Sequence, residues 1–330
     1  MRRKVCRGIW GGGIMGTVLA AQQIIIGTRA SPLALRQSDM VAAQICAMHG
    51  LDAAAIELRK ISTKGDRALD GKLSELGGKG LFTQELEAGL LDGSLSLAVH
   101  SLKDLPTQDP DGLVLGAILP RADAADMLVP RDGVVVTDLS DLPEGAHIGT
   151  ASLRRQAQLW RARPDLKISV LRGNVGTRLA KLEALHMHAT LLAAAGLARL
   201  DMTPTGALRL DTQTMLPAAG QGALAVQCRA NDDAILALLA PLHCVDTAQC
   251  VTAERAFLNA LDGSCRTPIA ALAEIKDDTL YMHGRLLAEN GSDMVEISVS
   301  APRATLADAA QMGREAGAAL RRQAPHLVAG

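Results

Sequence analysis

Aromatic side chains are scarce in this chain of 330 residues, which contains two Trp, one Tyr and two Phe. Proteins that bind single-stranded nucleic acids stack the bases on aromatic side chains, so this scarcity argues against that class of function. A general basic excess is missing too, since 34 Lys and Arg residues face 35 Asp and Glu residues and leave a formal charge of -1. A strongly charged ligand would therefore need a discrete local site.

Paired cysteine motifs are also lacking. The six cysteines are scattered without CxxC spacing, which disfavours a zinc ribbon or a redox motif and favours free thiols in a reducing compartment. His243, Cys244 and Cys250 are close in the sequence, but the pattern suggests no fourth ligand for a metal ion. We expect no metal site.

A long hydrophobic run is absent, even at the N-terminus. Residues 1–7 are basic and residues 8–21 are mildly apolar, which resembles a secretory signal. Glycines at positions 11–13 interrupt the apolar part, and it is too short to span a membrane as a helix. We interpret residues 1–22 as a disordered N-terminal extension, with export as the alternative, and expect a cytoplasmic protein without a membrane partner.

The remaining sequence is typical of a soluble globular protein, with 48% hydrophobic and 21% charged residues. From Gln23 onward, strand and helix patterns alternate, as in α/β folds with a largely parallel sheet. Breaks at Pro120–Ala125 and Pro217–Gly222 indicate that the chain crosses from one lobe to another and returns. We therefore predict two periplasmic-binding-protein-like α/β lobes around a cleft, followed by an α+β domain. The expected domains are residues 23–120 with 221–242, residues 121–220, and residues 243–330.

Local signals place several element ends. Ser31 followed by Pro32 predicts a helix start. Asp246 with Gln249 resembles a capping box that opens a helix through Leu261. The other expected elements are strands at 24–26, 56–59, 95–99, 168–171, 269–275, 280–287 and 295–299, and helices at 82–91, 153–159, around 179–185 and at 306–322.

Basic residues concentrate in one stretch. Two strand-to-helix turns place Arg154 and Arg155 in a first helical turn, and Arg172 and Arg178 around the carboxyl end of a strand, where ligands bind in open α/β sheets. Guanidinium groups favour carboxylates and phosphates, so the stretch predicts a polyanionic ligand. A solvated basic face is the alternative. Between Gly149 and Leu182, one acid, Asp165, faces Arg154, Arg155, Arg161, Arg163, Lys167, Arg172, Arg178 and Lys181.

Two further residues are candidates for chemistry. Asp104 follows an expected buried strand and precedes Pro106, where a carboxylate can hold an N–H group and move a proton. A loop cap or a salt bridge with Lys103 is the alternative. Cys265 lies on a loop beside Arg266, where a cation can lower the thiol pKa and permit covalent chemistry. An inert loop cysteine is the alternative.

Eight motifs occur in one order along the chain. Each is weak alone, but the ordered set is specific. The motifs are residues 27–35 (GTRASPLAL), 77–82 (GGKGLF), 98–106 (AVHSLKDLP), 152–156 (SLRRQ), 171–179 (LRGNVGTRL), 195–197 (AGL), 220–222 (GQG) and the loop around Cys265. From Ile24 to its end the chain thereby resembles the porphobilinogen deaminase (hydroxymethylbilane synthase) family.

The resemblance implies a transferase that condenses four porphobilinogen molecules head to tail, losing ammonia at each addition, and releases hydroxymethylbilane for tetrapyrrole (heme) biosynthesis. It implies that Cys265 carries a covalent dipyrromethane cofactor through a thioether and that Asp104 is the catalytic residue. The acetate and propionate arms of the pyrroles would supply the predicted polyanion. The implied cofactor-binding residues are Ser101, Lys103, Thr150, Ser152, Arg154, Arg155 and Arg172. Those for porphobilinogen and the growing oligopyrrole are Arg29, Ser31, Phe82, Arg172, Arg178 and Arg199.

Two other functions fit parts of the sequence. A non-catalytic two-lobed binding protein for a small dicarboxylate would use arginines in the same cleft and would fit export. An RNA-binding module would use the basic stretch and show steeply salt-dependent affinity, but the low aromatic content argues against it. The deaminase interpretation alone predicts a covalent adduct at Cys265. We expect a monomer with no nucleic-acid partner.

Overall fold

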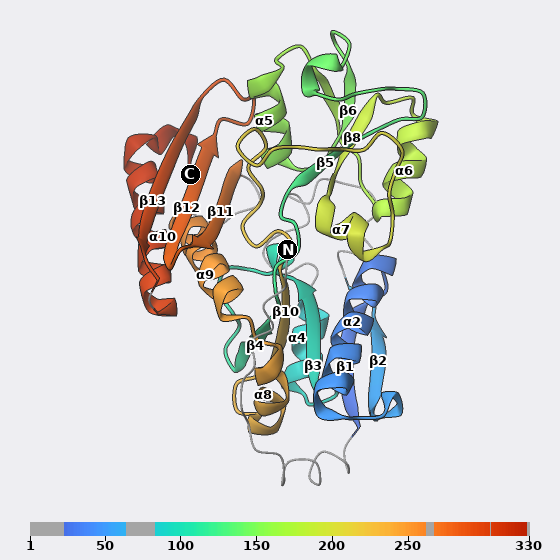
Figure 1. The fold of residues 1–330 in the computed structure, drawn as a ribbon, viewed down its shortest axis with the longest axis vertical. Coiled ribbons are helices and arrows are strands. Elements are labelled where there is room, and N and C mark those ends of the chain that lie inside the picture. The colour runs from blue at the N-terminus through green and yellow to red at the C-terminus, as the bar shows by residue number, and fades with distance from the viewer. Residues whose placement is uncertain (1–22, 64–82, 262–266, 304, 329–330) are drawn as a thin grey trace.

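The structure is a computed structural model that describes residues 23–63, 83–261, 267–303 and 305–328. Figure 1 shows two lobes that meet at the centre of the molecule and a third domain beside both. Within the described residues there are two sheets of five strands and one sheet of three strands. The expected disordered extension, residues 1–22, lies outside the described residues, and the residue limits given above for the domains remain predictions.

The first lobe contains a mixed sheet. Its elements are β1 (Ile24–Arg29), α2 (Pro32–His49), η1 (Ala53–Ala55), β2 (Ile56–Ile61), α4 (Gln84–Leu91), β3 (Leu97–Ser101), η2 (Leu102–Asp104), β4 (Leu113–Ile118), β10 (Leu224–Arg229), α8 (Asp233–Leu239) and η4 (Ala240–Leu242). The strand order is β2-β1-β3-β10-β4. The first three strands are parallel, and β10 is antiparallel to both of its neighbours. Apolar residues of α2 and α8 cover one face of the sheet, and those of α4 cover part of the other.

The second lobe repeats this plan. Its elements are β5 (Asp126–Pro130), η3 (Leu139–Asp141), β6 (His147–Gly149), α5 (Leu153–Ala162), β7 (Lys167–Ser169), α6 (Val175–Ala184), β8 (Ala189–Ala193), α7 (Ala194–Arg199) and β9 (Leu208–Arg209). The strand order is β7-β6-β8-β5-β9, with β5 antiparallel to its neighbours. Strand β5 here and β10 in the first lobe hold the same fourth place, and each follows a crossing between the lobes. The fold is thus the predicted pair of α/β lobes.

The two crossing segments, residues 120–125 and 217–222, run side by side. The N–H of Ala122 donates to the carbonyl of Gly222 at 3.1 Å. Gly222 has a φ of +89°, and a Cβ atom there would lie 2.5 Å from the Ala122 carbonyl oxygen. Only glycine tolerates both the backbone conformation and the close approach. The break and the return predicted from the sequence therefore form one joint between the lobes.

The C-terminal domain is α+β, as predicted. Its elements are α9 (Val245–Ala260), β11 (Ile269–Lys276), β12 (Thr279–Leu287), β13 (Met294–Pro302), α10 (Leu306–Gln323) and η5 (Pro325–Leu327). The three strands form an antiparallel sheet in chain order. Phe257 of α9 and Leu320 of α10 are fully buried in the core between the two helices and this sheet.

The structure corrects the expected start of α9. The helix begins at Val245, and its N-cap, Cys244, makes no side-chain hydrogen bond. Asp246 lies in the first helical turn and pairs with Arg303, while Gln249 is buried. The predicted capping box of Asp246 and Gln249 is therefore wrong, because Cys244 is the N-cap and the Asp246 carboxylate binds Arg303 instead.

Across the part of the chain that is described, no helix taken singly is long and apolar enough to cross a membrane. Two consecutive segments, Asp233–Leu242 and Val245–Ala260, are together long and apolar enough, judged by length and composition alone. The chain bends by 104° between them.

Candidate functional site

Asp104 lies on a short turn directly after β3. His100 and Ser101 still belong to the strand, which therefore ends two residues later than the expected strand at 95–99, and Leu102–Asp104 form η2. Leu102 is buried, and its N–H donates to the Ala223 carbonyl at 3.0 Å. Asp104 itself is exposed. The turn is therefore anchored by a buried leucine while the carboxylate-bearing residue remains accessible.

An arginine pair starts α5 in the second lobe. Ser152 is the N-cap, and its Oγ accepts from the N–H of Arg155 at 3.4 Å, which places Arg154 and Arg155 in the first turn as predicted. Both arginines are only 6% exposed. Asp126 at the start of β5 accepts from Arg154 Nη2 at 2.8 Å and from Arg155 Nη2 at 2.7 Å. The pair is thus buried around a carboxylate rather than spread over a solvated face.

Asp126 is a residue of this site that sequence reasoning missed. It is fully buried. Burial alone would raise the pKa of Asp126, but the guanidinium groups of Arg154 and Arg155 hold this pKa well below its usual range. Asp126 precedes Arg154 by 28 residues and stands at the start of an apolar strand, so the local pattern contained no signal for the pairing.

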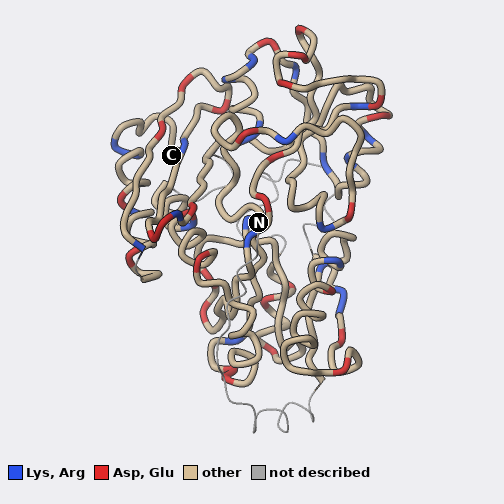
Figure 2. Tube along the Cα trace, in the orientation of Figure 1, with Lys and Arg blue, Asp and Glu red and all other residues tan. Residues whose placement is uncertain are grey.

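The predicted basic stretch is not one surface. Arg163, at the other end of α5, makes two hydrogen bonds of 2.8 Å to Asp165, about 14 Å along the helix from the first turn. Basic and acidic residues are interspersed along the described trace (Figure 2). The stretch therefore does not form the single solvated basic face that was the alternative, because its members divide between a buried pair and separate ends of helices.

Charged groups of both lobes meet at the joint. Lys103 is exposed as a residue, but burial of its ammonium group and repulsion from Arg155 lower the pKa of Lys103 to about 8, against the attraction of Asp104 and Asp126. Burial and repulsion from Arg155 likewise lower the pKa of Arg178 to about 10, against the attraction of Asp104. Lys103 and Asp104 of the first lobe are therefore within electrostatic reach of Arg155 and Arg178 of the second.

Gln221 links these groups through hydrogen bonds. It lies in the second crossing segment and is 1% exposed. Its Oε1 accepts from Lys103 Nζ at 3.1 Å, and its Nε2 donates to Asp126 Oδ1 at 2.8 Å and to the Ala124 carbonyl at 2.7 Å. The sequence contained this residue in its Gly-Gln-Gly motif, but the motif indicated only a return between lobes.

Five arginines of the described residues keep a buried donor without a partner, and three of them are candidate site residues. The Nε atoms of Arg154, Arg155 and Arg172 are buried and make no hydrogen bond to any described residue. Leaving such a donor unpaired costs about 1–3 kcal/mol, and native structures normally satisfy buried polar groups. A ligand that carries several carboxylates fits this set of donors.

The serine and threonine candidates make local hydrogen bonds. Ser31 Oγ accepts from the N–H of Ala34 at 3.2 Å, so the predicted cap of α2 is confirmed. Ser101 Oγ exchanges hydrogen bonds of 3.0 and 3.2 Å with the side chain of Gln37. Thr150 is buried, and its Oγ1 accepts from the N–H of Ser152 at 3.2 Å. These contacts hold the three hydroxyl groups in place beside the turns that start α2, η2 and α5.

The remaining arginine candidates lie at strand and helix ends. Arg199 ends α7, donates from Nη2 to the Gly222 carbonyl at 2.7 Å, and has a pKa lowered to about 10 by burial. Arg29 ends β1. Burial and the charge of Arg29 lower the pKa of His100 to about 4, which places these two side chains near each other in the first lobe.

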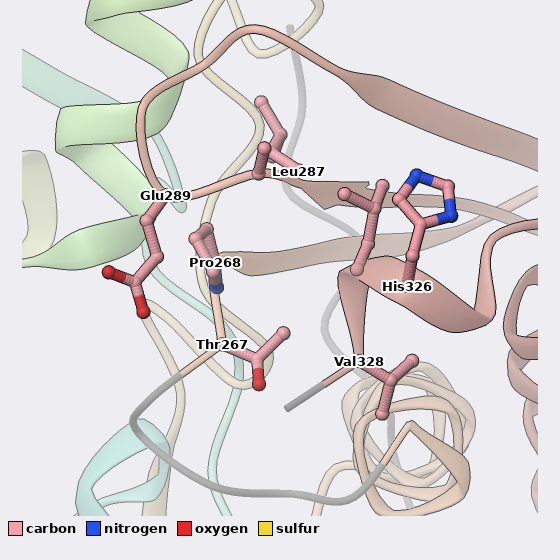
Figure 3. A pocket seen from close by; sticks show the side chains of 8 residues that line it. Thr267, Pro268, Leu287, Glu289, His326 and Val328 are labelled. Carbon is pink, nitrogen blue, oxygen red and sulfur yellow. The ribbon is translucent and has the colours of Figure 1, made fainter. Parts of the chain in front are cut away.

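Phe82 and Cys265 lie outside the described residues, so their roles remain predictions. The chain that follows Cys265 borders a cavity of about 240 Å³ in the C-terminal domain. In Figure 3, Thr267 and Pro268 come from the segment that enters β11, whereas His326 and Val328 come from the C-terminal segment. The described residues that line the cavity include no arginine.

Comparisons with known proteins agree with the motifs. Residues 24–237 match the family model described as "Porphobilinogen deaminase, dipyromethane cofactor binding domain", and residues 248–322 match "Porphobilinogen deaminase, C-terminal domain". A porphobilinogen deaminase of Sphingopyxis alaskensis is 51% identical over 82% of this chain and 86% of the relative. One from Syntrophotalea carbinolica is 49% identical over 86% and 89%, and one from Paracoccus denitrificans is 47% identical over 92% and 95%.

Proposed function

Because this chain belongs to the porphobilinogen deaminase family, we propose that it condenses four porphobilinogen molecules head to tail onto a covalent dipyrromethane. Ammonia leaves at each addition, and hydroxymethylbilane is released for tetrapyrrole biosynthesis, including that of heme. The observation that supports this proposal is the meeting of Lys103 and Asp104 with Arg155 and Arg178 at the joint between the lobes. An acid for proton transfer thus lies beside cations for a carboxylate-rich ligand.

The donor set fits a dipyrromethane bound at this place. The buried Nε groups of Arg154, Arg155 and Arg172 would pair with its carboxylates. The other residues proposed to hold it are Ser101, Lys103, Thr150 and Ser152, with the thioether at Cys265. When bound, the group supplies the pyrrole carbon to which the first substrate is joined.

Asp104 is the proposed catalytic residue. Its carboxylate can accept a hydrogen bond from a pyrrole N–H and stabilise the positive charge that develops on the substrate as ammonia leaves. It can also carry a proton during formation of the carbon–carbon bond. Asp104 attracts the cations Lys103 and Arg178, and neither of them is among the side chains that hydrogen-bond to Asp126.

The residues proposed for the substrate and the growing oligopyrrole are Arg29, Ser31, Phe82, Arg172, Arg178 and Arg199. Arginine forks match the acetate and propionate groups of each pyrrole. We propose that the protein works as a cytoplasmic monomer, with neither nucleic acid nor membrane as a partner. A non-catalytic binding protein for a dicarboxylate is not favoured, since the family comparison assigns the chain to the deaminases.

Intact-mass analysis of the full chain tests the proposed function. The protein should gain a dipyrromethane adduct, and peptide mapping should locate it at Cys265. Cys265→Ala should form no adduct, whereas Cys46→Ala, a free cysteine of α2, should load normally. Fully active protein with an unmodified Cys265, or an adduct retained in Cys265→Ala, would contradict the assignment. A dicarboxylate-binding protein would show reversible binding and no change in mass.

A further inference from the structure

Asp126 makes three hydrogen bonds to side chains from separate parts of the chain. Oδ2 accepts from Arg154 Nη2 at 2.8 Å, and Oδ1 accepts from Arg155 Nη2 at 2.7 Å and from Gln221 Nε2 at 2.8 Å. We propose that Asp126 is a positioning residue which, through Gln221, fixes the arginine pair of the second lobe relative to Lys103 of the first. This inference rests on the function proposed above.

The first argument concerns the orientation of the guanidinium planes. Arg154 Nη1 donates to the Leu216 carbonyl at 2.6 Å, and Arg155 Nη1 donates to the Leu191 carbonyl at 2.8 Å. Each planar group is therefore held at both terminal nitrogens, once by a carbonyl and once by Asp126. Since the guanidinium is rigid, these two contacts also fix the direction of the unpartnered Nε–H. Asp126 thereby sets where both remaining donors point.

The second argument concerns charge. Two adjacent buried guanidinium groups repel each other, and one carboxylate between them offsets part of this repulsion while leaving a net positive charge for an anionic ligand. A second carboxylate would cancel that charge. The arrangement of Asp126 with Arg154 and Arg155 thus stabilises the pair and keeps it attractive to a ligand with several carboxylates.

The third argument is the connection between lobes. Gln221 accepts from Lys103 Nζ at 3.1 Å with one atom of its amide and donates to Asp126 with the other. The amide oxygen can only accept a hydrogen bond and the amide nitrogen can only donate one. The oxygen must therefore face the ammonium of Lys103, and the nitrogen must face the carboxylate of Asp126. Lys103 is next to Asp104 in η2. The hydrogen bonds through Gln221 and Asp126 therefore connect η2 to the arginine pair. If Asp126 only neutralised the two arginines, its hydrogen bond to Gln221 would not be needed.

The test compares Asp126→Asn with the wild type in full-length protein freed of adduct. Porphobilinogen is added, and the rate at which the adduct forms is followed by intact mass, together with the melting temperature before and after loading. A displacement of about 1 Å at such a site can cost about 100-fold in rate, so we expect loading to slow by that order. Asp232→Asn is the control, because it removes a partly buried carboxylate that pairs with Arg229 away from the joint; it should lower the melting temperature but load at the wild-type rate.

The double variant Asp126→Asn with Gln221→Glu separates positioning from charge. It restores one carboxylate at the neighbouring position, but one oxygen of that carboxylate faces Lys103, so only the other faces the arginine pair. Recovery of the melting temperature without recovery of loading supports positioning, whereas recovery of both overturns it. Wild type that forms no adduct overturns the proposed function and this inference with it. Wild type and Asp126→Asn that load equally fast overturn the inference alone.

A further variant covers the case in which Asp126→Asn does not fold. Asp126→Glu keeps the charge and shifts the carboxylate by one methylene, so the buried arginines stay neutralised while their direction changes. Slow loading of folded Asp126→Glu supports the proposal. Loading at the wild-type rate overturns it.

Discussion

Glu254 of α9 forms a buried ion pair with Arg121 of the first crossing segment. The same carboxylate accepts from the N–H of Gly220, in the second crossing segment, at 2.7 Å and from the N–H of Ala273, in β11, at 2.7 Å. One side chain of the C-terminal domain therefore binds both crossing segments of the joint between the lobes. The C-terminal domain, in which Cys265 is proposed to carry the cofactor, is therefore attached where the lobes are connected.

We predict that Glu254→Gln lowers the free energy of unfolding by about 3 kcal/mol, because it leaves the charge of Arg121 largely buried without a counter-ion. Urea or thermal denaturation measures the change. Asp123→Asn is the control: its ion pair with Arg209 is exposed, so its loss should cost about 0–1 kcal/mol. Equal effects of the two substitutions would show that Glu254 does not fasten the joint.

Asp104→Ala should lower turnover by about 100- to 1000-fold, since it removes the carboxylate proposed to stabilise the developing positive charge. Asp104 is exposed, so the free energy of unfolding should change by about 0.5 kcal/mol or less. Steady-state kinetics and denaturation on the same sample check both values. Asp111→Ala, an exposed acid outside the site, should leave both unchanged. Near-normal turnover of Asp104→Ala would contradict its catalytic role.

Arg154→Leu should impair both stability and cofactor loading. From the sequence, loading is expected to suffer more than stability. The structure adds a cost of about 3–5 kcal/mol, because Arg154 is buried and pairs with Asp126. Melting temperature and adduct mass are measured together, with Arg161→Leu, an exposed position of the same helix, as the control. Normal loading despite a lowered melting temperature would assign Arg154 a purely structural role.

Binding of carboxylate-bearing substrate should weaken as the pH rises through about 8. The pKa of Lys103 is lowered to about 8 by burial and by repulsion from Arg155 and Arg154, against Asp104 and Asp126. Its ammonium is therefore charged below this pH and neutral above it, so its attraction for an anion is lost on the alkaline side. Because Lys103 is proposed to bind the dipyrromethane, which is made from substrate, the rate of adduct formation from porphobilinogen is the readout. Lys103→Arg stays charged and should remove the pH dependence of this rate. Identical pH profiles for the two proteins would contradict the prediction.

The sequence predicted the elements of the C-terminal domain well because their signals are local. Alternation of apolar residues covers β12 and β13 within a few residues of the observed ends. The predicted cap at Ser31 likewise depends on a side chain and an N–H three residues away. The incorrect capping box at Asp246 shows the limit of such signals, since the Asp246 carboxylate forms an ion pair with Arg303, which is distant in the sequence.

Candidate site residues could be found along the chain, but their partners could not. Lys103, Asp104 and the arginines stand in motifs that are visible in sequence, and their assignment needs no tertiary information. Asp126 pairs with arginines 28 and 29 residues later, and Gln221 with Asp126 over 95 residues. The contacts of Asp126 with the arginines need the second lobe to fold, and the contact with Gln221 also needs the chain to return from that lobe. Composition and periodicity are properties of short segments, whereas the charge balance of a buried site is a property of chain segments brought together by folding.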